Sequence, residues 1–111
     1  MKGTENVLEA AKQNRCKVVF SSTSDVYGKN PTLPFSEDSN LVLGQTNVSR
    51  WAYAVSKIYD EHLCFAYQEK FGLPIVILRY FGGYGPHQNL TWWGGPQSIF
   101  ITAALKKEPL P

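Results

Sequence analysis

The stretch RWAYAVSKIYDEHLCFAYQEKFGLPIVILRY, residues 50–80, decides the fold, because in it a long helix is followed at once by a strand. Residues 50–71 contain neither glycine nor proline and predict the longest helix of the chain, which Gly72 is well suited to end. Apolar side chains occur all round this helix, so we expect it to be covered on more than one side. The β-rich run at 74–80 predicts the strand.

The segments on either side continue an alternation of helices and strands. Residues 4–13 predict a helix, residues 17–22 read as a buried strand of a parallel sheet, and residues 97–107 predict a final helix. Residues 23–49 predict a loop whose length is uncommon unless the loop carries function. This order favours an α/β layer fold with a parallel sheet. Two strands cannot cover three helices, so the chain is interpreted as a piece of a larger domain.

The composition argues against several classes of protein. The 111 residues allow one domain at most, and 11 Lys and Arg against 9 Asp and Glu leave a net charge of +2. Without a basic block, this charge argues against a binder of nucleic acid or of anionic membrane surfaces. The apolar run at 74–78 is too short to span a bilayer. We therefore expect no nucleic-acid or membrane partner.

The cysteines and histidines indicate neither a disulfide framework nor a metal site. Cys16 and Cys64 are interpreted as reduced thiols of a cytoplasmic protein, because the first residues lack the apolar core of a signal peptide. His62 and His87 do not have the spacing of metal ligands, so we expect no metal and give neither residue a role.

Tyr53 and Lys57 are candidates for acid–base chemistry. They are four residues apart on the predicted long helix and therefore share one of its faces. A lysine ammonium close to a phenol stabilises the phenolate, and such a tyrosine can act as a general base on an alcohol. Taken alone, the spacing is common, and an aromatic residue beside a snorkelling lysine explains it more often.

Polar residues follow both predicted strands and strengthen the interpretation of Tyr53 and Lys57 as functional residues. The first strand ends in SSTSDVYG, residues 21–28, and the second in RYFGGYGP, residues 79–86. Ligands of open parallel sheets bind beyond the carboxyl ends of the strands, where hydroxyl groups can bond a substrate oxygen. The structural alternative is a Ser/Thr-rich turn that satisfies its own backbone. All these features together favour a site at the strand ends.

These motifs resemble the extended short-chain dehydrogenase/reductase family, in its nucleotide-sugar epimerase/dehydratase branch. The likeness lies in FSSTSDVYG (residues 20–28), YAVSK (53–57) and the second strand end, and the segment at 2–11 is similar to a helix of the family. It implies a partial Rossmann-type parallel sheet with flanking helices. Residues 1–111 would be the central part of an NAD-binding domain, without its N-terminal glycine-rich turn and its C-terminal substrate region.

The resemblance also implies roles for residues at the site. Tyr53 would be the general base that takes the proton of a sugar hydroxyl, and Lys57 would bond the nicotinamide ribose. Thr23 would bond the reacting oxygen, and all three would contact the NAD cofactor. Phe81 would lie beside the nicotinamide, and Tyr80 near the sugar.

Some positions depart from the family pattern. Gly82 stands where many members have an Asn that contacts the substrate diphosphate, so this substrate contact is in doubt. Ser24 replaces the Asp of the 4,6-dehydratases, which counts against dehydration, whereas Asp25 matches an acidic residue of some members. Arg50-Trp51 resembles the nucleotide-sugar decarboxylase branch, although no cation for a substrate carboxylate is identified. Trp92-Trp93 is expected to pack under a loop rather than to touch a base or sugar.

Three functions follow from the resemblance. The first is an NAD-dependent nucleotide-sugar epimerase that oxidises the sugar at C4, and the second is a UDP-glucuronate-type decarboxylase. The third is a truncated, inactive chain that only self-associates. The family also implies a homodimer through the helices at 4–13 and 50–71. The adjacent Asp60 and Glu61 are expected on a solvated helix face, with ion pairing as the less favoured alternative.

Overall fold

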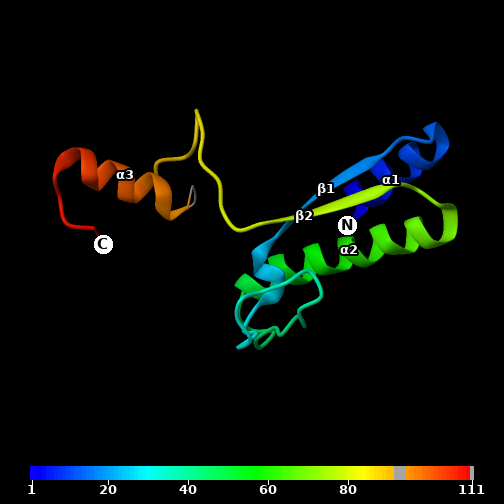
Figure 1. Cartoon of the computed structure of the whole chain (residues 1–111), viewed down its shortest axis with the longest axis horizontal. Helices are drawn as coiled ribbons and strands as arrows, with labels where there is room; N and C mark the ends of the chain where they lie inside the picture. The colour runs from blue at the N-terminus through cyan, green and yellow to red at the C-terminus, as the bar shows by residue number, and fades with distance from the viewer. Residues whose placement is uncertain (92–94, 111) are drawn as a thin grey trace. The chain divides into compact units, whose positions relative to one another are not determined.

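A computed structural model describes residues 1–91 and 95–110 of the chain. The chain forms two units, one from Met1 to Tyr80 and one that begins at Phe81. The first unit contains α1 (Lys2–Asn14), β1 (Val18–Thr23), the 3-10 helix η1 (Ser24–Tyr27), α2 (Arg50–Phe71) and β2 (Ile75–Tyr80), as Figure 1 shows. The second unit contains α3 (Pro96–Lys106).

The two strands form a parallel pair, as the sequence predicts. Val18 lies opposite Ile75, and Thr23, the last residue of β1, lies opposite Tyr80, the last residue of β2. Parallel strands need a crossover connection, and the segment that contains α2 provides it. The carboxyl ends of both strands therefore meet at one edge of the sheet.

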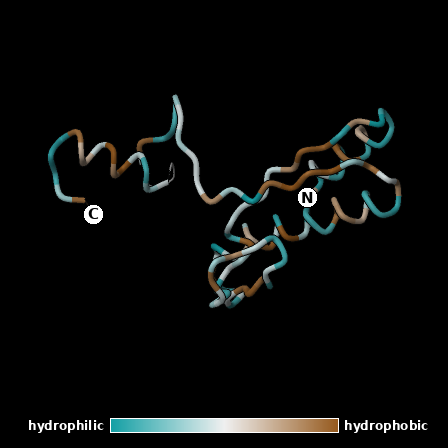
Figure 2. The backbone as a smooth tube through the Cα atoms, in the orientation of Figure 1, coloured by the Kyte–Doolittle hydropathy of each residue, from teal (hydrophilic) through white to brown (hydrophobic). Residues whose placement is uncertain are grey.

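One face of the sheet carries the hydrophobic core. Leu8 and Ala11 of α1 pack with Cys64 and Tyr67 of α2 and with Leu73. The partly buried residues that pack against this cluster are Val18, Phe20, Leu63, Ile75 and Ile77. Figure 2 shows the hydrophobic residues that run along both strands.

The other face of the sheet differs from the expectation of a fully buried strand. Val19, Val76 and Leu78 remain 58%, 43% and 38% exposed. Side chains alternate between the two faces of a strand, and both helices of this unit pack with the residues of the opposite face. Within the described residues of this unit, burial therefore follows a period of two rather than a continuous run.

The long helix has the bounds that the sequence predicts. Its last residue, Phe71, is followed by Gly72 in the left-handed region at φ 64°, where its N–H bonds to the carbonyl of Gln68. Val55 and Tyr59 are about half exposed, at 46% and 51%, so the first unit does not itself supply the cover expected on more than one side of this helix. In this single chain, α1 and the sheet cover one side of α2.

The segment between β1 and α2 has more structure than the predicted loop. It begins with η1 and is tied back to itself where Lys29 N–H donates to the carbonyl of Val42, at 2.6 Å. Gly28 has φ 60°, and a Cβ there would lie 2.2 Å from that same carbonyl oxygen. At Gly44, a Cβ would lie 2.1 Å from the indole nitrogen of Trp51. Both close approaches need glycine.

The remaining helices and strands deviate from prediction by one or two residues. The predicted helix at 4–13 begins earlier, at Lys2, and the final helix spans 96–106 rather than 97–107. The first strand runs to Thr23, one residue beyond the predicted end. This shift makes Thr23 a strand residue instead of the first residue of the loop.

Candidate active site

The side chain of Lys57 connects α2 to β1. Its ammonium donates a hydrogen bond of 2.8 Å to the carbonyl oxygen of Ser21. The same nitrogen lies 5.9 Å from the centre of the Tyr53 ring and 5.1 Å from the centre of the Phe20 ring. One turn of α2 thus brings the ammonium to the phenol ring, as the spacing of the two residues predicts.

Thr23 stands where β1 passes into η1. Its hydroxyl oxygen accepts a 3.2 Å hydrogen bond from the N–H of Asp25 and so caps the 3-10 helix. This is the local bond that the Ser/Thr-rich alternative predicts. A hydroxyl that accepts such a bond retains a proton that it can donate to another oxygen.

Asp25, two residues after Thr23, forms an ion pair with Arg50. The guanidinium nitrogen of Arg50 lies 2.7 Å from the Asp25 carboxylate, and the guanidinium is 5.5 Å from the centre of the Trp51 ring. The pair joins η1 to the first turn of α2. Arg50, which carries the likeness to the decarboxylase branch, therefore has a carboxylate partner within the chain.

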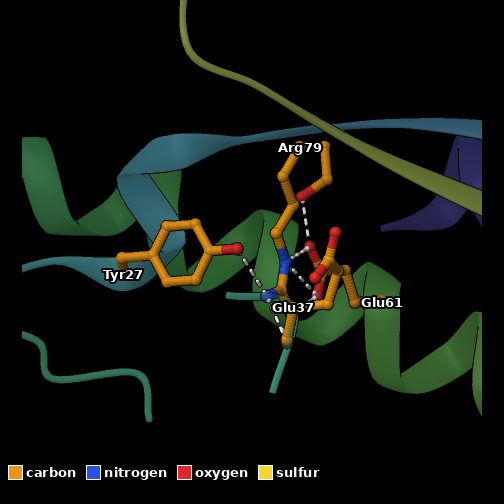
Figure 3. Close-up of polar contacts among 5 residues, drawn as sticks. Tyr27, Glu37, Glu61 and Arg79 are labelled. Carbon is orange, nitrogen blue, oxygen red and sulfur yellow. Dashed lines mark hydrogen bonds and ion pairs between the residues drawn. The ribbon is translucent and has the colours of Figure 1, made fainter. Parts of the chain in front are cut away.

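A partly buried ion pair between Glu61 and Arg79 connects α2 to β2 (Figure 3). Arg79 donates from Nε and Nη2 to the Glu61 carboxylate, at 3.0 and 2.7 Å. Ser22 also donates to Glu61, whose side chain is only 4% exposed. From Nη1, Arg79 reaches the hydroxyl of Tyr27 at 3.2 Å and the carbonyl of Glu37 at 3.0 Å. Hydrogen bonding to Glu61 raises the pKa of the Arg79 guanidinium above its ordinary value.

The prediction of a solvated face at Asp60 and Glu61 is wrong. Both residues are buried, at 5% and 3% exposed. Asp60 accepts hydrogen bonds from the hydroxyl of Thr4, at 2.8 Å, and from the N-terminal amine of Met1, at 3.1 Å. Buried carboxylates need such partners because removal from water is costly.

A signal for the Glu61 pair was present in the sequence of β2. Arg79 follows Ile75 and Ile77 at the period of two and therefore shares their inward face. A cation on the inward face of a strand requires an anion from the element packed against it. On α2, Glu61 provides that anion.

The remaining predicted site residues divide between the two units. Tyr80 ends β2 opposite Thr23 and is 53% exposed. Phe81 and Gly82 belong to the second unit, in which Phe81 is 68% exposed. Trp92 and Trp93 lie outside the described residues.

Two further findings concern residues 1–91 and 95–110. Among them, no group of three or more His, Cys, Asp or Glu side chains is arranged to hold a metal ion. None of the helices in these ranges combines the length and apolar character needed to cross a membrane.

Known proteins resemble this chain over nearly its whole length. The model of the NAD dependent epimerase/dehydratase family matches residues 1–110. The chain belongs to this family. The resemblance to this family is thereby confirmed, and so is the Rossmann-type class of the fold, which the solved relatives share.

Relatives within the NAD dependent epimerase/dehydratase family include several activities. UDP-N-acetyl-alpha-D-glucosaminuronate decarboxylase of Bacillus cytotoxicus is 46% identical over 108 residues, which are 97% of this chain and 33% of that protein. UDP-N-acetylglucosamine 4-epimerase from Methanobrevibacter ruminantium has a TM-score of 0.81 at 34% identity, covering 97% of this chain and 34% of its own.

A third relative was solved with its cofactor. UDP-glucuronic acid 4-epimerase from Bacillus cereus, in complex with NAD, has a TM-score of 0.73 at 37% identity. The match covers 96% of this chain and 32% of the epimerase. The chain thus spans about a third of the length of the relatives it matches.

Proposed function

We propose that this chain carries the acid–base residues of an NAD-dependent enzyme that oxidises the C4 hydroxyl of a nucleotide sugar. The observation that supports it most is the position of Lys57, whose ammonium lies 5.9 Å from the centre of the Tyr53 ring and donates to the Ser21 carbonyl, two residues before the end of β1. Membership of the family supplies the reaction class. Since the chain is about a third of its relatives, the activity is proposed for the complete protein.

Each residue has a separate task in this proposal. Tyr53, as phenolate, takes the proton from the sugar C4 hydroxyl and later returns it. Lys57 stabilises that phenolate through the charge of its ammonium. Thr23 donates its hydroxyl proton to the reacting oxygen and so holds the sugar against Tyr53.

The donors at the strand ends fit a nicotinamide ribose. An ammonium has three N–H donors, and the bond to Ser21 occupies one of those on Lys57. The other two suit the hydroxyl oxygens of a ribose. NAD, when bound, supplies the acceptor and donor of hydride. Thr23, Tyr53, Lys57 and Phe81 are proposed as its contacts within this chain.

The proposed substrate is a nucleotide sugar, with Tyr80 beside the sugar and Gly82 near the diphosphate. Half of the Tyr80 side chain is exposed at the strand edge, where a sugar can pack on its ring. Gly82 offers only its backbone, so we propose that side chains elsewhere in the complete protein supply the remaining diphosphate contacts.

Two reaction outcomes compete after oxidation at C4. An epimerase returns hydride to the other face of the ketone, whereas a decarboxylase uses the ketone to release carbon dioxide from a uronic acid. We place epimerisation first. Decarboxylation is the second candidate because the chain is 46% identical to UDP-N-acetyl-alpha-D-glucosaminuronate decarboxylase. A chain that only self-associates is the third.

We further propose a homodimer in the cytoplasm, formed through the helices at 4–13 and 50–71. Val7 of α1 is 57% exposed, and Val55 and Tyr59 of α2 are about half exposed, so both helices present apolar surface that a second copy can bury. Cys16 and Cys64 are unpaired thiols, as suits a reducing compartment.

Product analysis tests the reaction class. The complete protein is incubated with NAD and either UDP-glucose or UDP-glucuronate. We expect the C4 epimer of one of these sugars as the product. Release of carbon dioxide from UDP-glucuronate would select the second candidate. If NAD binds and neither substrate changes, with UDP-N-acetyl sugars also inert, the enzymatic proposal is wrong and the third candidate remains.

A further inference from the structure

We propose that Glu61 and Arg79 are positioning residues, whose partly buried ion pair holds Lys57 and Tyr53 of α2 in place against the carboxyl ends of β1 and β2. The inference rests on the proposed function for the role of Tyr53 and Lys57. It concerns a different set of atoms, namely the cluster of Ser22, Glu61 and Arg79. Figure 3 shows Glu61 and Arg79 of this cluster with the loop residues Tyr27 and Glu37.

Every member of the cluster is a close neighbour of a proposed site residue. Glu61 lies one helical turn after Lys57 on α2, and its carboxylate accepts a bond from Ser22, the residue before Thr23. Arg79, the residue before Tyr80, binds the same carboxylate through two nitrogens. A single carboxylate thus fixes the helix to both strand ends.

The same guanidinium also fixes the loop beyond η1. Its Nη1 donates to the hydroxyl of Tyr27 and to the carbonyl of Glu37, and the guanidinium carbon lies 5.0 Å from the centre of the Tyr27 ring. Tyr27 in turn stacks on Phe35, with ring centres 4.6 Å apart. Thr23 caps η1, so the segment that follows Thr23 is held at both of its ends.

The geometry of the Glu61–Arg79 ion pair suits a role in orienting α2 and the strands better than a role in stabilising the fold. Burying two charges is expensive, and apolar side chains of similar size often stabilise a fold as well or better. What a planar guanidinium adds is direction, because its donors leave the group at fixed angles and meet several acceptors at once. Arg79 uses all three of its nitrogens in this way.

The first test replaces Arg79 by Lys in the complete protein. Lysine keeps the charge but offers one compact ammonium in place of the fork, so Glu61, Tyr27 and Glu37 cannot all remain bound. We expect kcat to fall by about 10- to 100-fold, the effect of a small misplacement of catalytic groups, with KM changed less than about threefold. Arg15→Lys, the same substitution at an exposed residue of the first unit, is the matched control and should leave kcat unchanged.

The second test separates position from stability. The double variant Glu61→Leu/Arg79→Met replaces the pair by apolar side chains of similar size, and we expect it to fold with an unfolding midpoint close to that of wild type. Its kcat should stay as low as that of Arg79→Lys. A kcat within about twofold of wild type in either folded variant overturns the inference. If neither variant folds, the pair is needed for folding itself, which also overturns it.

A measurement on the chain itself keeps this inference separate from the proposed function. In wild type, NMR should show a nuclear Overhauser contact between the Lys57 side chain and the Phe20 ring, because Lys57 Nζ lies 5.1 Å from the centre of that ring. Both variants should lose this contact while the contacts within the core cluster that contains Leu8 and Cys64 persist. If both variants lose this contact but the wild-type protein converts no nucleotide sugar, the positioning inference holds and the proposed function fails. If the contact persists unchanged in both folded variants, the inference fails alone.

Discussion

The ammonium of Lys57 donates a 2.8 Å hydrogen bond to the backbone carbonyl of Ser21, two residues before the end of β1. This bond ties the face of α2 that carries Tyr53 to the edge of the sheet where both strands end. Ligands of parallel sheets bind at that edge. The spacing of Tyr53 and Lys57 is common by itself. The bond from Lys57 to Ser21 gives the pair weight because it places both residues beside the sheet edge where such ligands bind.

Removal of this ammonium should weaken cofactor binding. For Lys57→Met in the complete protein, we expect the Kd for NAD to rise by about 10- to 100-fold, since hydrogen bonds from charged groups contribute about 1.5–3 kcal/mol. Isothermal titration with NAD measures the change. Lys70→Met, a change at an exposed lysine in the last turn of the same helix, should bind NAD like wild type. Equal Kd values for wild type and Lys57→Met would remove Lys57 from the cofactor site.

The two cysteines should differ sharply in reactivity. Burial, with the nearby charges of Asp60 and Glu61, raises the pKa of the Cys64 thiol to about 11, whereas Cys16 is exposed. At pH 8 iodoacetamide should therefore label Cys16 within minutes and leave Cys64 unmodified until denaturant is added. Mass spectrometry of tryptic peptides identifies the labelled residue. Rapid labelling of Cys64 in the folded chain would show that the reagent reaches its side chain and that the thiol is not buried.

Stability should depend on pH through Tyr67 and Glu9. The hydrogen bond from Tyr67 to Glu9 raises the pKa of the tyrosine to about 12, and hydrogen bonds from Lys12 and Tyr67 lower the pKa of Glu9. A raised tyrosine pKa stabilises the fold below the unfolded value of about 10, and this stability is lost as pH rises toward 12. A lowered carboxylate pKa stabilises above the unfolded value of about 4.3, and this stability is lost as pH falls through the folded value.

Tyr67→Phe tests this linkage. Wild type should unfold at higher denaturant concentration than the variant between about pH 5 and 10, and the difference should shrink on either side of that range. Urea titrations at a series of pH values give the two midpoints. A difference that does not change with pH would show that the hydroxyl contributes packing alone.

The exposed side of α2 should mediate association. Light scattering of the chain at micromolar concentration should detect a dimer or a larger species, and Tyr59→Asp should shift it toward monomer, because a charge cannot be buried there without a partner. Gln68→Glu adds the same charge at another exposed position of α2 and should not change the mass. A wild-type monomer in both the isolated chain and the complete protein would contradict the interface.

Local sequence signals predicted the elements of the fold well. The bounds of α2 agree because no glycine or proline interrupts residues 50–71 and because Gly72 adopts the left-handed conformation that ends a helix. The exposed face of the strands could not be predicted in this way. The sequence of a parallel strand is typically apolar on both faces, which predicts burial of both. Val19 and Val76 remain exposed because the described residues of their unit do not cover that face.

The candidate site could be predicted where helical spacing or the shared edge of two parallel strands brings its residues together. Tyr53 and Lys57 are joined by helical spacing, so the pair was visible before the fold was known. Glu61 and Arg79 lie 18 residues apart and meet only because β2 returns beside the helix. Glu61 therefore looked like part of a solvated surface, and only the inward register of Arg79 hinted at its partner.

The acid–base role of Tyr53 is the central claim, and turnover of two matched variants tests it most directly. Tyr53→Phe and Tyr59→Phe remove the same hydroxyl from residues that are 49% and 51% exposed on the same helix. With NAD and the nucleotide-sugar substrate, the complete protein should lose at least about 100-fold in kcat with Tyr53→Phe, the lower range for loss of a general base, and should keep its kcat with Tyr59→Phe. Substrate Kd should stay within about threefold of wild type in both variants. Wild-type turnover in Tyr53→Phe would contradict the account.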